Sequence, residues 1–135
     1  MTSEPTNASP TVMQIGEVAT RTGLSLRSLR HWEEVGLLQP SGRTEGGFRL
    51  YTEADVEKIL VIRRMKPLGF SLEQMKDVMR DLEVLADPGA TAADRSDVRT
   101  RLAAIRAEAT ERRLTLVRQL DMADEFLALI DAQSD

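Results

Sequence analysis

The side chains best suited to chemistry gather in a short run from Ser25 to Glu34, which is predicted to form a helix. Leu26, Leu29 and Val35 recur at roughly helical spacing and are expected to face a core. The opposite side then carries Arg27, Ser28, Arg30, His31 and Glu34. Arginines near the start of an outward-facing helix suit the reading helix of a helix-turn-helix, which lies in the DNA major groove. A helical hairpin with a solvated basic face is the alternative.

The chain around this run, residues 15–38, is typical of two short helices joined by a tight turn. The first helix is predicted over about Gly16–Thr22 and the second over about Ser25–Val35. Gly23 stands where the turn requires a positive φ, which glycine adopts at little cost. The hydroxyl of Ser25 can accept from the free backbone amides that open the second helix.

A short β-hairpin is predicted directly after the helix pair. Several turn-forming residues precede and interrupt it, and Phe48–Tyr51 alternates like a strand; the turn formers are Pro40, Gly42, Gly46 and Gly47. A hairpin in this place is a wing, on which Arg43 and Arg49 would present positive charge to phosphates or to a minor groove. An ordinary surface hairpin with two solvated arginines is the alternative.

Two further capped helices are expected after the wing. Thr52 with Asp55 forms a variant of the capping box at the start of the third helix, and Ser71 with Gln74 forms another at the start of the fourth. The third helix ends in a basic cluster of Arg63, Arg64 and Lys66. The helix dipole favours cations at that end and is a sufficient structural reason for them, so a contact of this cluster with phosphate is a further expectation.

A single long amphipathic helix is expected from about Asp94 to the end of the chain, which contains no Pro or Gly there. Its length is on the order of 55 Å at 1.5 Å per residue, more than a small domain can cover. The stripe therefore predicts a dimerising coiled coil, with a helix folded back on its own domain as the alternative. Apart from Arg113, the residues that recur in steps of three and four are apolar: Leu102, Ile105, Ala109, Leu116, Leu120, Ala123, Leu127 and Ile130.

Composition narrows the function classes. There is no Cys among the 135 residues and only one His, so no thiolate metal site or disulfide framework is possible and no metal or other cofactor is expected. No Ser/His/Asp arrangement, phosphate-cradling glycine loop or paired acids in a plausible cleft can be found, which argues against an enzyme and leaves no catalytic residue to name. The chain also lacks an apolar run long enough for a membrane span and a secretion signal, so a cytoplasmic protein is expected.

The net charge of −4 does not argue against a nucleic-acid partner once it is divided along the chain. Residues 1–70 hold nine Lys/Arg against eight Asp/Glu, and residues 71–135 hold nine against fourteen. The acidity therefore belongs to the half that carries the long helix, and it leaves the predicted reading head slightly basic.

Several motifs in order resemble the MerR family of bacterial transcription regulators. The run IGEVATRTGLSLRSLRHWEEVGLL is similar to that family's N-terminal signature, and RTEGGFRLYTEADVEKILVIRRMKPLGFSLEQMKDVM is similar to its wing and second helix pair. Together they cover residues 14–79, and the predicted coil extends the likeness to nearly the whole chain.

The resemblance implies a homodimer joined by an antiparallel coiled coil, each head reading half of an inverted repeat in double-stranded promoter DNA. The family distorts the DNA between promoter elements so that RNA polymerase can engage both, which is a switch through DNA shape. By position, the DNA-contacting residues would be Ser25, Arg27, Ser28, Arg30, His31, Trp32, Arg43, Gly47, Arg49, Tyr51, Arg64 and Lys66. Arg27 suits a guanine edge and Arg30 a phosphate, whereas His31 and Trp32 replace a pair that is typically Tyr-Tyr.

The expected protein is thus mainly α, a winged helix-turn-helix head followed by a long coiled-coil helix. The predicted parts are a disordered tail over 1–12, the head over 13–86, a linker over 87–93 and the coil over 94–135. A small-molecule effector could bind between the coil and the fourth helix, near Met75, Met79, Leu82 and Phe126, although core packing explains these residues equally well. An architectural winged-helix DNA-binding protein and a helical adaptor that does not bind DNA are the rival functions.

Overall fold

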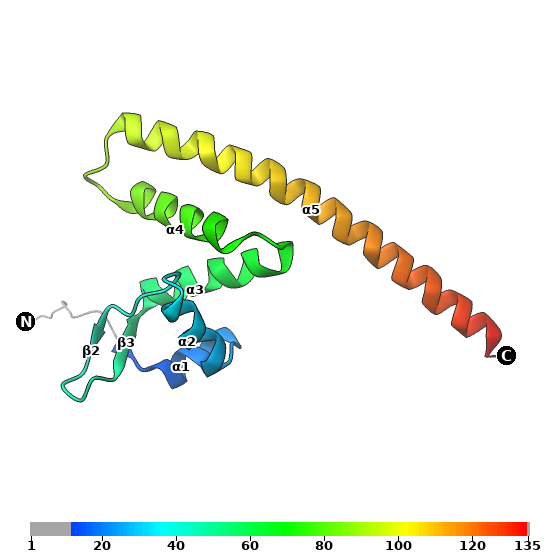
Figure 1. The fold of residues 1–135 in the computed structure, drawn as a ribbon, viewed down its shortest axis with the longest axis horizontal. Coiled ribbons are helices and arrows are strands. Elements are labelled where there is room, and N and C mark those ends of the chain that lie inside the picture. Colours follow the sequence, from blue (N-terminus) through cyan, green and yellow to red (C-terminus); the bar gives the residue numbers. More distant parts are fainter. Residues whose placement is uncertain (1–11, 135) are drawn as a thin grey trace, which may run out of the picture. The chain divides into compact units, whose positions relative to one another are not determined.

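The computed structural model describes residues 12–134, which are mainly helical with a small three-stranded sheet (Figure 1). Contacts divide the chain into two compact units, one up to Met79 and one from Arg80. The expected disordered tail lies outside the described residues except for Val12, which forms part of a strand. None of the helices in the described part of the chain has both the length and the apolar run that crossing a membrane demands. The elements in order are β1 (Val12–Met13), α1 (Ile15–Thr22), α2 (Leu26–Glu34), β2 (Gly42–Arg43), β3 (Arg49–Thr52), α3 (Glu53–Met65), η1 (Lys66–Leu68), α4 (Leu72–Ala86) and α5 (Ala92–Gln133).

The predicted helix-turn-helix is confirmed. Gly23 ends α1 with φ 71°, and its backbone N–H donates to the Ala19 carbonyl at 2.9 Å. Ser25 then caps α2, since its hydroxyl oxygen accepts from the Ser28 backbone N–H at 3.0 Å. These two residues fix the turn locally, through a left-handed glycine and a side-chain cap.

The core-facing side of α2 differs from the expected one. Leu29 is 0% exposed as predicted, but Leu26 is 39% exposed and Val35 is only half-buried, while Trp32 is 4% exposed. At 100° per residue, Leu26 and Trp32 lie symmetrically on either side of Leu29, so periodicity alone does not choose between them. Packing in the folded head buries the larger indole side chain and leaves Leu26 at the solvent-facing start of the helix.

The predicted wing is present as an antiparallel pair of β2 and β3. Arg43 lies opposite Arg49 in this pair, and Gly47 takes φ 84° in the connecting turn. The sheet has a third strand, β1, because Met13 pairs with Tyr51 at the other edge of β3. The sequence stretch around Met13 is extended as expected, but its partner lies almost forty residues away and was not predicted.

Both capping boxes are confirmed. At the start of α3, the Thr52 hydroxyl accepts from the Asp55 backbone N–H at 3.2 Å and the Asp55 carboxylate accepts from the Thr52 N–H at 2.9 Å. Asp55 is 4% exposed and also accepts from the Ser41 hydroxyl at 2.5 Å, so it joins the loop before the wing to α3. At the start of α4, Ser71 and Gln74 exchange the equivalent bonds at 3.0 and 3.1 Å.

The second unit contains α5, which is one uninterrupted helix of 42 residues. It begins at Ala92, earlier than the expected Asp94, because Thr91 supplies a cap whose hydroxyl accepts from the Asp94 N–H. Within this unit Arg101 donates to the carboxylate of Asp81 at 2.8 Å, and Val98 is 1% exposed. Beyond about residue 113 the side chains of α5 are exposed, so this part of the apolar stripe has no cover within the unit itself.

Thr52→Ala is expected to lower the free energy of unfolding by about 1 kcal/mol, because it removes the acceptor for the Asp55 backbone N–H. Thr20→Ala is the control, since the Thr20 hydroxyl only donates to the Gly16 carbonyl on an exposed face of α1, and it should change stability by less than about 0.5 kcal/mol. Denaturant unfolding of the full chain measures both, and equal losses would contradict the role of the cap.

Candidate nucleic-acid interface

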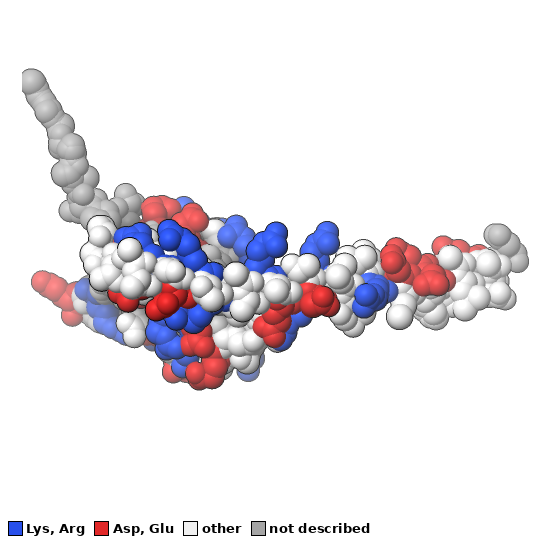
Figure 2. Space-filling model, turned by 90° about the horizontal axis from the view of Figure 1, so that it is seen from above, with Lys and Arg blue, Asp and Glu red and all other residues white. Residues whose placement is uncertain are grey.

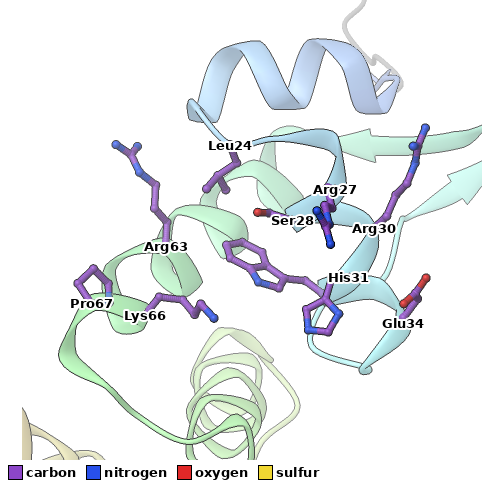
Figure 3. A pocket seen from close by; sticks show the side chains of 10 residues that line it. Leu24, Arg27, Ser28, Arg30, His31, Glu34, Arg63, Lys66 and Pro67 are labelled. Carbon is purple, nitrogen blue, oxygen red and sulfur yellow. The ribbon is translucent and has the colours of Figure 1, made fainter.

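One open cavity in the first unit brings α2 together with the end of α3 (Figure 3). Its volume is about 790 Å³. The side chains that line it come from the turn before α2, from α2 itself, and from α3 and η1. They are Leu24, Arg27, Ser28, Arg30, His31, Trp32, Glu34, Arg63, Lys66 and Pro67.

Side chains of α2 form one side of the cavity. Arg27 and His31 are exposed and lie one helical turn apart on the same side of α2, whereas Arg30 and Glu34 point away from the centre of the cavity (Figure 3). Ser28 is half-buried, and its hydroxyl accepts from that of Ser25 at 3.0 Å. The cavity therefore presents a guanidinium and an imidazole together, both of which can donate to an anion or to a base edge.

Two residues predicted to contact DNA on this helix also have structural roles. Ser25 caps α2 and does not line the cavity. Trp32 lines the cavity but is only 4% exposed, so most of its ring belongs to the core of the head. The other four residues predicted to contact DNA from this helix all line the cavity: Arg27, Ser28, Arg30 and His31.

The end of α3 and η1 supply two further cations to the lining. Lys66 extends from η1 toward α2, whereas the guanidinium of Arg63, one turn earlier, points away from α2 (Figure 3). The prediction chose Arg64 with Lys66, but Arg63 lines the cavity and Arg64 does not. Helical spacing could have made this distinction, because positions i and i+3 share a face and positions i and i+2 do not.

The charge of this lining is strongly positive. Arg27, Arg30, Arg63 and Lys66 are opposed by one acidic residue, Glu34. Phosphate oxygens accept charge-assisted hydrogen bonds from such groups, and the guanidinium groups can bind them in bidentate fashion. An anionic polymer that offers both phosphates and base edges suits this lining. Within residues 12–134, no three His, Cys, Asp or Glu side chains gather closely enough to hold a metal ion.

The predicted residues of the wing are placed apart from this cavity. Arg43 and Arg49 both bind the carboxylate of Glu33, and Arg43 also donates to the Gly47 carbonyl at 3.2 Å. The prediction that Tyr51 contacts DNA is wrong for the side chain as it stands, because Tyr51 is 0% exposed. Burial also raises the pKa of its phenol, with a smaller contribution from the Glu33 carboxylate, so it remains a neutral core residue.

Known proteins match this chain along most of its length. Residues 13–82 match the MerR HTH family of regulatory proteins. The HTH-type transcriptional regulator YfmP of Bacillus subtilis is 38% identical over 117 residues, which cover 84% of this chain and 79% of YfmP. The nodulation protein NolA of Bradyrhizobium elkanii is 34% identical over 122 residues, and the match covers 90% of this chain but only 55% of NolA.

A solved structure has the same fold. HiNmlR, described as a MerR family regulator lacking the sensor domain and bound to promoter DNA, superposes with a TM-score of 0.67. The likeness covers 85% of this chain and 80% of HiNmlR at 22% sequence identity, a level that establishes the fold alone.

Arg63→Ala is expected to weaken binding to double-stranded DNA of any sequence and to reduce the salt dependence by about one unit of log affinity per log salt, the effect of one lost phosphate contact. Arg64→Ala removes the same charge from the next position, which lies outside the cavity, and should have the smaller effect. Fluorescence anisotropy at several salt concentrations measures both, and equal changes would contradict the assignment of Arg63 to the interface.

Proposed function

The chain belongs to the MerR family of helix-turn-helix regulators and is a transcription regulator of that type, and we propose that two copies of it bind one promoter site together. Each head would read half of an inverted repeat, with α2 in the major groove. The observation that carries this proposal is the cationic cavity, where the exposed side of α2 and the end of α3 present Arg27, His31 and Lys66 together. Because bacterial promoters lie in the cytoplasm, we propose that this regulator is a cytoplasmic protein.

The cavity suggests a division of roles among its side chains. Arg27 is our candidate for a base edge, because a guanidinium can bond both acceptors of a guanine in the major groove. Arg30, Arg63 and Lys66 are candidates for phosphate contacts that fix the register of the head on the duplex. His31 can donate to phosphate from the same side of α2 as Arg27.

The second copy is proposed to pack along the apolar stripe of α5. Leu120, Leu127 and Ile130 of this stripe are 61%, 57% and 46% exposed, which is costly for a helix that stays alone in water. Their recurrence in steps of three and four is the spacing at which two helices interlock side chains. We extend the proposed seam over all eight stripe residues, Leu102, Ile105, Ala109, Leu116, Leu120, Ala123, Leu127 and Ile130.

The charges along α5 favour an antiparallel pair. Residues 99–118 contain six arginines and two glutamates, whereas residues 119–135 contain five acidic residues and no Lys or Arg. Figure 2 shows acidic side chains gathering toward the C-terminal end of the helix. An antiparallel pair would set the basic half of each helix against the acidic half of the other, and a parallel pair would set like charges together.

We extend the proposal to the action on the promoter. Two heads joined through one rigid seam would hold their two reading helices at a fixed separation, so they could bind both half-sites fully only if the DNA between them were bent or untwisted. Such a distortion would alter how RNA polymerase engages the promoter. For an effector, the buried positions of Met75 and Met79, 5% and 8% exposed in the first unit, favour core packing over ligand binding.

Footprinting of the purified protein on its own upstream region tests the proposal, and a protected inverted repeat is the expected result. Arg27→Ala should lower affinity for that site by about 1–3 kcal/mol and relax the preference at one base pair, as loss of a bidentate contact does. Lys66→Ala should instead weaken binding to all sequences alike. Equal base preferences in the wild type and Arg27→Ala would remove Arg27 from base reading.

Leu116→Asp in the full chain should convert the dimer to a monomer, because it buries a carboxylate in the proposed seam. Leu114→Asp is a matched control: the two leucines are 42% and 41% exposed, but they lie about 160° apart around the helix. Analytical ultracentrifugation should find monomers only for Leu116→Asp. If both variants remained dimers, the seam would be wrongly placed.

A further inference from the structure

A single carboxylate, that of Glu33, joins the recognition helix to both strands of the wing. Its Oε1 accepts from the Nε of Arg49 on β3, and its Oε2 accepts from a terminal guanidinium nitrogen of Arg43 on β2 at 3.3 Å. The Glu33 side chain is 15% exposed, compared with 33% for Arg49 and 49% for Arg43. Glu33 is therefore the most buried member of this three-residue cluster, which we call the wing clamp.

The wing clamp offsets a repulsion that the sheet itself creates. Arg43 and Arg49 are direct cross-strand partners, and like charges in that position are unfavourable. Glu33 supplies the counter-charge to both, from a different element. Without it, two guanidinium groups would stand opposite each other beside a partly buried surface, and the strands could relieve the repulsion only by moving away from α2 or by finding another anion.

Glu33 also lies on a different side of α2 from the cavity. Arg30, His31 and Glu34 line the cavity, but Glu33 does not. The same short helix thus presents Arg27 and His31 toward the proposed major groove and Glu33 toward the wing. The turn of the wing is connected to the same cluster, because Arg43 also donates to the Gly47 carbonyl.

We propose that Glu33 is a positioning residue that determines specificity, by holding the wing at a fixed angle to α2 and by withholding the charges of Arg43 and Arg49 from phosphates. This inference rests on the proposed DNA-binding function. A fixed angle means that wing and helix fit only a duplex whose grooves match both at once, which is a form of shape reading. Arginines engaged by Glu33 add little to indiscriminate attraction by the phosphate backbone, which any sequence supplies equally.

The test compares Glu33→Gln with Glu57→Gln in the full chain. The two variants change net charge equally, but Glu57 is exposed on α3 and belongs neither to the cavity lining nor to the wing clamp. Affinity is measured for the duplex protected in footprinting and for a scrambled duplex of the same length, each over a series of salt concentrations. The readouts are the ratio of the two affinities and the salt slope on scrambled DNA.

For Glu33→Gln, the salt slope on scrambled DNA should steepen by about one to two units, since up to two arginines become free to bind phosphates. The affinity ratio should fall at least about fivefold, the effect of one lost specific contact. Glu57→Gln should leave the ratio near that of the wild type. Equal ratios and slopes for the two variants would overturn the proposal.

A second variant keeps the proposal testable if Glu33→Gln does not fold. Arg43→Gln frees Glu33 from its more exposed partner, and the affinity ratio must fall here as well, although the salt slope should not rise; an unchanged ratio overturns the proposal. If the proposed DNA-binding function is wrong, the result differs from both of these outcomes. The wild-type protein itself would then bind the two duplexes equally, whatever residue stands at position 33.

Discussion

The burial of one side of α2 is the constraint on which the head depends. Leu29 and Trp32 are 0% and 4% exposed and hold this nine-residue helix against the core. In a helix of about two and a half turns, the position of each side chain around the axis is fixed by the helical repeat. Burial of these two residues therefore decides the direction in which every other side chain points. Arg27 and His31 are turned outward together, and Glu33 is turned toward the wing. The surface of the head that is suited to binding DNA is thus a consequence of how the core of the head is packed.

The positive charge that this head has available for binding phosphates is smaller than the number of its Lys and Arg residues implies. Arg43 and Arg49 share one carboxylate, so the wing carries less free positive charge than two exposed arginines would. The cationic side chains that line the cavity lie apart from that carboxylate. In our proposal the cavity supplies general attraction and base contact, and the wing supplies a shape constraint. These two contributions respond differently to salt, because only the first depends on free charge.

Much of the fold could be predicted because its signals are local. The glycine turn at Gly23, the cap at Ser25 and the capping box of Thr52 with Asp55 each depend on residues within a few positions of one another. The long helix α5 was equally predictable, since a run without Pro or Gly that repeats in steps of three and four favours one structure. Its start was misplaced by two residues because the cap at Thr91 was overlooked. For the site, the chain alone indicated α2 and the end of α3 as the elements that carry it.

The sequence by itself therefore determined the order of the elements, their caps and the family to which the chain belongs. Tertiary structure alone decided which side chains of α2 and β3 are buried: Trp32 in place of Leu26, and Tyr51 in the core. The physical reason is the range of the interactions. Caps and turns are made between near neighbours and are visible in the chain, whereas burial, strand pairing and the engagement of wing charges by Glu33 join residues that are distant in sequence and adjacent only in the folded head.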